Sequence, residues 1–204
     1  MSKKLTEYVV KTGIVPVESY EIYQYGFQIG LEMLFSFVVC FGVATYLHMI
    51  PEFVVYTGIF MLLRTYAGGV HLNSFRACFT CSIIVQTVTL LISNKFKFTV
   101  INAWLIILAS AIFIVKVAPV ESINRELDSD EKIHCKKVTM RILFGIILFT
   151  GCCTVGGMSN TVSLIALTVL VILISQYVGI VKFKIEKSKM SGDDRGLLFP
   201  LFIF

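Results

Sequence analysis

Long apolar runs separated by short polar segments dominate the pattern of this chain. Six runs stand out, and each is expected to form a helix: residues 27–49, 52–63, 75–93, 99–118, 140–158 and 161–181. A helix needs about 20 apolar residues to cross the hydrocarbon core of a bilayer. The second run is too short for this unless it recruits residues 64–67, and otherwise it re-enters the membrane. The pattern predicts an all-α polytopic integral membrane protein with about six membrane segments.

Composition supports the same class. Of the 204 residues, 56% are hydrophobic and only 15% are charged. A soluble domain of this size has no core large enough to bury so much apolar surface. We therefore expect one membrane-embedded domain, residues 1–204, surrounded by lipid. It would have an N-terminal segment, 1–25, and a C-terminal tail, 182–204.

Basic residues predict the orientation in the membrane, because lysine and arginine gather on the cytoplasmic side. They occur in the N-terminal segment, the 64–76 loop, the 119–139 loop and the C-terminal tail, whereas only Lys95 and Lys97 fall on the opposite side. Six crossings would then place both termini and the 64–76 loop in the cytoplasm. The net charge of +5 fits this orientation. No motif for nucleic-acid binding accompanies it, so no nucleic-acid partner is expected.

A polar cluster interrupts the apolar pattern after the second run. It reads Arg64-Thr-Tyr-Ala-Gly-Gly-Val-His71, and Cys78 follows after six further residues. A thiol is nucleophilic as the thiolate, and an imidazole can accept its proton near neutral pH. Cys78 also forms a C-x-x-C pair with Cys81, which is typical of redox or metal sites, but no second ligand pair or βαβ context is present. The cluster favours a nucleophilic cysteine that needs no metal or organic cofactor.

Helix geometry constrains how His71 could reach Cys78. Seven residues of continuous helix rise about 10.5 Å, which is too far for a contact of about 3 Å between a nucleophile and its base. We therefore predict that His71 lies in the Gly-Gly loop and that Asn73 or Ser74 caps the helix carrying Cys78.

The glycines and arginines of the cluster are candidates for shaping such a site. Gly68 and Gly69 could turn backbone N–H groups toward an oxyanion, because glycine accepts positive φ and close approach. Arg64 and Arg76 would favour a thiolate at Cys78 and could hold an acidic substrate tail.

These residues resemble the motif of the accessory gene regulator B (AgrB) family of membrane peptidases. The resemblance extends to the length, the hydropathy and an Ala-Pro step at Ala118-Pro119. It implies a cysteine endopeptidase that cuts a small AgrD-like propeptide in Gram-positive quorum sensing. Cys78 would be the nucleophile and His71 its partner. The acyl-enzyme would be captured by a thiol or hydroxyl of the substrate, giving a thiolactone or lactone ring. Arg64 and Gly69 match further family positions, and the family's basic loop corresponds loosely to Lys132, Lys136 and Lys137.

Several polar residues inside the apolar runs have more than one interpretation. Glu32 could pair with Arg64 or orient His71, or it could reach the inner interface. Gln86 and Gln176 are expected to make hydrogen bonds between helices. Glycines along the fifth run favour either close helix packing or a dimer seam: Gly145, Gly151, Gly156 and Gly157. Cys135, in the charged 119–139 loop, is expected to be an exposed thiol.

Two other classes of function stay open. A peptide transporter or exporter would also suit six spans, although no nucleotide-binding motif or inverted repeat is visible. A non-catalytic scaffold could bind an amphipathic partner helix. The amphipathic spacing within residues 1–25 favours a helix on the inner membrane surface, or else a loosely packed tail. A homodimer is implied by the family resemblance alone.

Overall fold

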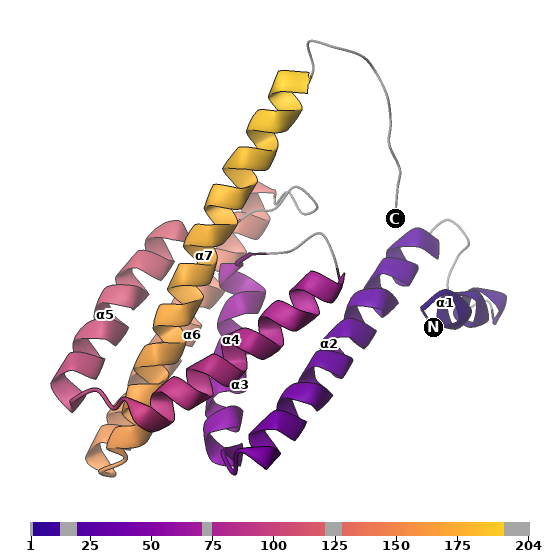
Figure 1. Cartoon of the computed structure of the whole chain (residues 1–204). Helices are drawn as coiled ribbons and strands as arrows, with labels where there is room; N and C mark the ends of the chain where they lie inside the picture. Colours follow the sequence, from indigo (N-terminus) through magenta and orange to yellow (C-terminus); the bar gives the residue numbers. More distant parts are fainter. Residues whose placement is uncertain (1, 13–19, 71–74, 121–127, 194–204) are drawn as a thin grey trace. The chain divides into compact units, whose positions relative to one another are not determined.

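The computed structural model describes residues 2–12, 20–70, 75–120 and 128–193, and all regular structure within these ranges is helical (Figure 1). The helices are α1 (Ser2–Lys11), α2 (Tyr20–Tyr46), α3 (Ile50–Ala67), α4 (Phe75–Lys95), α5 (Val100–Val117), α6 (Ser129–Val155) and α7 (Ser159–Asp193). The predicted all-α class is thus confirmed.

Four helices contain stretches long and apolar enough to cross a membrane, within the described residues. They lie in α4, α5, α6 and α7, and α2 contributes a shorter apolar stretch, Met33–Tyr46. Large apolar side chains such as Ile101, Leu105 and Phe144 are more than 60% exposed, as expected for helices that face lipid. Four of the six predicted spans are therefore supported, and the spans assigned to the first two runs stay predictions. Helix α3 includes residues 64–67, and whether it crosses or re-enters the membrane stays a prediction.

Two helices are longer than the apolar pattern indicated. The predicted loop 119–139 ends early, because α6 begins at Ser129. A capping box between Asp128 and Glu131 supplies hydrogen bonds at this helix start, so charged residues there are helical rather than loop. Cys135 is therefore buried and not the predicted exposed thiol. Helix α7 likewise continues to Asp193, into the predicted tail.

The chain divides into two compact units. The first contains residues 1–50 and 72–88, and the second contains residues 51–71 and 89–204. The prediction of one membrane-embedded domain is not decided by this division. In the first unit, α1 packs against α2, and the Gln86 Nε2 of α4 donates to the Cys40 carbonyl of α2 at 3.4 Å. The interhelical hydrogen bond predicted for Gln86 is thus confirmed.

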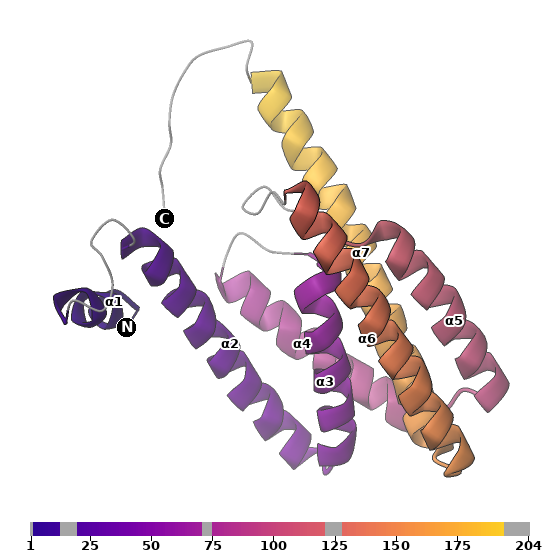
Figure 2. The same cartoon turned by 180° about the vertical axis from the view of Figure 1, so that it is seen from behind.

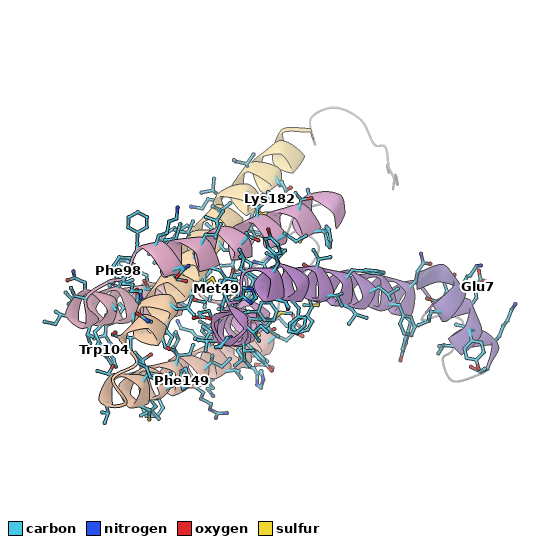
Figure 3. The ribbon with its side chains drawn as sticks, turned by 60° about the horizontal axis from the view of Figure 1, so that its bottom comes forward. Glu7, Met49, Phe98, Trp104, Phe149 and Lys182 are labelled. Carbon is cyan, nitrogen blue, oxygen red and sulfur yellow. The ribbon has the colours of Figure 1, made fainter. Side chains whose placement is uncertain are left out.

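The second unit is built around α7, which packs against α5 and α6 (Figures 1 and 2). Its core joins α3, α5, α6 and α7 through residues such as Leu63, Ile107 and Ile165. Polar contacts hold the N-terminal end of α5. The Trp104 indole N–H donates to Thr154 Oγ1 at 3.1 Å, and the Phe98 N–H donates to Ser163 Oγ at 2.9 Å; Figure 3 labels both aromatic residues. In this core the C-terminal end of α3 lies against α7.

The glycines of α6 serve different purposes from one another. Gly156 and Gly157 end the helix, with Gly157 at φ +71° and the Met158 N–H donating to the Cys153 carbonyl. A Cβ added at Gly145 or Gly151 would meet no described atom within 4 Å. Close packing at these two positions is therefore wrong for the part of the chain that the structure describes, and the dimer seam stays a prediction.

Candidate functional site

The candidate site begins where α3 ends. Ala67 is the last residue of the helix, and Gly68 follows at φ +77° with its N–H donating to the Arg64 carbonyl at 3.2 Å. This is a left-handed helix cap, which favours glycine. A Cβ at Gly68 would also lie 2.6 Å from the Val120 carbonyl oxygen. The N–H of Gly68, predicted to face an oxyanion, is thus used to end the helix.

Arg64 ties the turn to the last helix. Its Nη1 donates to Ser175 Oγ of α7 at 3.1 Å, and its Nη2 donates to the Val70 carbonyl. The guanidinium also lies over the Phe60 ring, 5.7 Å from the ring centroid. The rigid fork of an arginine can hold two acceptors at once. Arg64 therefore shapes the turn, in addition to the electrostatic role predicted for it.

The Gly-Gly turn after α3 packs against helix α7. The Val70 N–H donates to the Ser175 carbonyl at 3.1 Å. A Cβ at Gly69 would lie 2.8 Å from Arg64 Nη1 and 2.9 Å from Ser175 Oγ. On the α7 side, a Cβ at Gly179 would lie 3.0 Å from the Gly69 carbonyl carbon. Two glycines therefore allow the turn and α7 to approach each other backbone to backbone.

Gln176 completes the contact from the same turn of α7. Its side chain is fully buried, and its Nε2 donates to the Ala67 carbonyl at 3.0 Å. This confirms the interhelical hydrogen bond predicted for Gln176. The same carbonyl accepts from the Val120 N–H at 3.1 Å, just after the cis Ala118–Pro119 bond. The Gln176 Oε1 has no hydrogen-bond partner among the described residues, a state that costs about 1–3 kcal/mol for a buried acceptor.

Substitution of Gly179 should test this close approach. We expect Gly179→Ala to lower the free energy of unfolding by about 1–3 kcal/mol, because the new methyl group meets backbone atoms that cannot move independently. Gly58→Ala is the matched control, since a Cβ at that helical glycine of α3 meets nothing within 4 Å; it should be neutral or stabilising by up to about 1 kcal/mol. Thermal unfolding in the same detergent compares the two variants. Equal stability of both would contradict the packing described for Gly179.

The remaining predicted site residues fall elsewhere. Cys78 is in α4, in the first unit, where its side chain is partly exposed and its carbonyl accepts from Ser82 Oγ at 2.9 Å. His71 lies outside the described residues, as do the predicted helix caps Asn73 and Ser74. The side chains of Glu32 and Arg76 are also outside them. The contact between His71 and Cys78 and the roles of Glu32 and Arg76 therefore stay predictions.

Comparison with known proteins places this arrangement in a family. The model of the accessory gene regulator B family, AgrB, matches residues 2–180, which include Arg64, the Gly-Gly turn, His71 and Cys78. The chain belongs to the AgrB family. A protein described as AgrB-like from Clostridium perfringens (strain SM101 / Type A) is 27% identical over 152 residues, which is 70% of this chain and 71% of that protein. No solved structure matches the chain. Membership of the AgrB family supports a role in the accessory gene regulator quorum-sensing system.

Sequence reasoning missed part of the site in this AgrB protein. Ser175 and Gly179 lie in an apolar stretch more than 100 residues after the Gly-Gly turn, and no local pattern links them to it. The only available signal was Gln176, a polar residue within a predicted span. Its neighbour Ser175 could have been found from it, because an amide inside a membrane helix indicates a partner helix.

Proposed function

We propose that this AgrB protein is a membrane cysteine endopeptidase that cuts the C-terminal part from a small quorum-sensing propeptide. The observation that carries the proposal is the family match over residues 2–180, within which the cluster from Arg64 to Cys78 has the residue types of a thiol peptidase. The partly exposed Cys78 thiol in the first turns of α4 is compatible with attack on a peptide.

In the proposed reaction, His71 removes the proton from Cys78 Sγ, and the thiolate attacks the carbonyl carbon of the scissile bond. His71 then returns the proton to the leaving amine nitrogen, which departs with the C-terminal fragment. A thiol or hydroxyl of the bound signal sequence attacks the resulting thioester. That step releases a thiolactone or lactone ring and restores Cys78. Gly69 and Arg64 shape the site. Arg76 favours the thiolate at Cys78, and Glu32 pairs with Arg64 or orients His71. No metal or organic cofactor takes part.

The proposal includes a setting for this chemistry. The protein sits in the cell membrane with the 64–76 loop and both termini in the cytoplasm, and its partners are membrane lipid and an amphipathic, AgrD-like propeptide. Exposed Lys132, Lys136 and Lys137 on the first turns of α6 could attract an acidic propeptide tail. A site at the membrane edge also limits water, which would otherwise compete with ring closure.

The experiment that tests the proposal is a single incubation of the protein in lipid vesicles with a short amphipathic propeptide from the same bacterium. Mass spectrometry should detect the released C-terminal fragment and an acyl adduct on the peptide that contains Cys78. A propeptide that is neither cut nor attached to the protein, while it crosses the vesicle membrane, would overturn the proposal in favour of a transporter.

A further inference from the structure

One turn of α7 determines where the backbone lies immediately before His71. Val70 is the residue that precedes His71. Its N–H donates to the Ser175 carbonyl at 3.1 Å, and its carbonyl accepts from Arg64 Nη2. The same Arg64 donates through Nη1 to Ser175 Oγ at 3.1 Å. Ser175, 105 positions later, therefore holds the Val70 N–H directly and the Val70 carbonyl through Arg64.

The contact is tighter than ordinary helix packing. The backbone of Gly69 approaches α7 so closely that a Cβ at Gly179 would lie 3.0 Å from the Gly69 carbonyl carbon. Gly69 itself leaves room for the Arg64–Ser175 hydrogen bond, because a Cβ there would be within 3 Å of both partner atoms. A turn held on this scale has little freedom to shift relative to α7.

The buried amide of Gln176 adds little to stability by itself. The Ala67 carbonyl already accepts from the Val120 N–H, so it would keep a partner without Gln176. The Gln176 Oε1 stays without a hydrogen-bond partner among the described residues. An apolar side chain of similar length would avoid that cost. The amide at this position is better explained by placement of the turn than by the energy of folding.

We propose that Ser175 and Gln176 of α7 are positioning residues for His71, acting through Arg64 and the Gly-Gly turn. The inference rests on the proposed function, in which His71 is the base for Cys78. Neither side chain touches the reacting atoms in this proposal. The Ser175 hydroxyl holds Arg64, which in turn holds the Val70 carbonyl, and the Gln176 amide holds the Ala67 carbonyl at the start of the turn. A misplacement of about 1 Å can lower an enzyme's rate by about 100-fold.

The test measures alkylation of Cys78 by iodoacetamide in vesicles of the full-length protein, resolved by peptide mass spectrometry from pH 6 to 10. Alkylation reports the thiolate, so it needs no propeptide. Cys81, three residues later on α4, is the internal control. His71→Ala should slow Cys78 alkylation at pH 7 by about threefold or more and leave the rate at high pH unchanged.

Ser175→Ala and Gln176→Met should move the Cys78 profile toward that of His71→Ala, without loss of thermal stability for Gln176→Met. The matched control is Thr168→Val, which removes another buried hydroxyl of α7, one that donates to the Leu164 carbonyl of its own helix. Its profile should equal that of the wild type. A merely structural role for Ser175 or Gln176 would lower thermal stability but not change the pH profile.

The two possible failures give different results. If wild type and His71→Ala share one profile, the His71–Cys78 pair is wrong, and the proposed function fails together with this inference. If those two differ while Ser175→Ala and Gln176→Met both follow the wild type, the proposed function stands and the positioning role is overturned.

Discussion

Cys78→Ala should abolish propeptide cleavage to the detection limit, and His71→Ala should lower it by about 100-fold or more. The first variant removes the atom that forms the thioester, and the second removes the group that accepts its proton. Fragment release in lipid vesicles, followed by mass spectrometry over time, measures both rates. Cys78→Ser should also lose activity, because a hydroxyl is a far weaker nucleophile than a thiolate at neutral pH.

Cys81→Ala is the matched control for this prediction. It removes a second, similarly placed thiol of α4, three residues beyond Cys78, and cleavage should stay at the wild-type rate. Loss of activity in Cys81→Ala but not in Cys78→Ala would reassign the nucleophile. Equal cleavage by every variant would mean that the His/Cys pair is not responsible for the reaction.

Gly69→Ala should lower propeptide cleavage by about 100-fold while leaving most of the folding stability intact. The new methyl group would lie 2.8 Å from Arg64 Nη1 and 2.9 Å from Ser175 Oγ. The end of an arginine side chain can move away, so the fold survives. The Arg64–Ser175 hydrogen bond does not survive. The turn before His71 then loses one of its attachments to α7, and the Val70–Ser175 backbone hydrogen bond and the Gln176–Ala67 hydrogen bond remain.

A double substitution sharpens the prediction for Gly69. If Gly69→Ala acts by separating Arg64 from Ser175, then adding Ser175→Ala should cause little further loss, because both changes remove one interaction. Independent, multiplying effects would contradict this explanation. Gly68→Ala provides a contrast, since its Cβ would meet the Val120 backbone oxygen at 2.6 Å and its φ is +77°. It should reduce both thermal stability and cleavage.

The helices were predictable from local sequence, but their ends were only partly so. Apolar runs of about 20 residues in a chain this hydrophobic leave membrane helices as the main solution, because backbone polar groups must be satisfied internally in lipid. The extra turns at the start of α6 escaped prediction because charged residues 129–139 give no apolar signal there. Local hydrogen bonds at Asp128 and Glu131, rather than burial, start that helix.

The candidate catalytic residues could also be recognised from the sequence. Arg64, the paired glycines, His71 and Cys78 lie within 15 residues, and their types and spacing resemble the motif of the AgrB family. The family match over residues 2–180 confirmed the family. The sequence could not indicate which hydrogen bonds each of these residues makes in the folded protein. Gly68 was expected to offer an N–H to an oxyanion, whereas that N–H ends α3.

By itself, then, the sequence determined the membrane class, the family and the candidate nucleophile and base, because each depends on composition or on residues close together in the chain. Only the tertiary structure decided what holds the turn before His71. Ser175, Gln176 and Gly179 meet that turn across more than 100 residues, through backbone contacts and hydrogen bonds. Such contacts arise from the packing of α7 against α3. Apart from the polar Gln176 within a predicted span, they leave no trace in the local pattern of either segment.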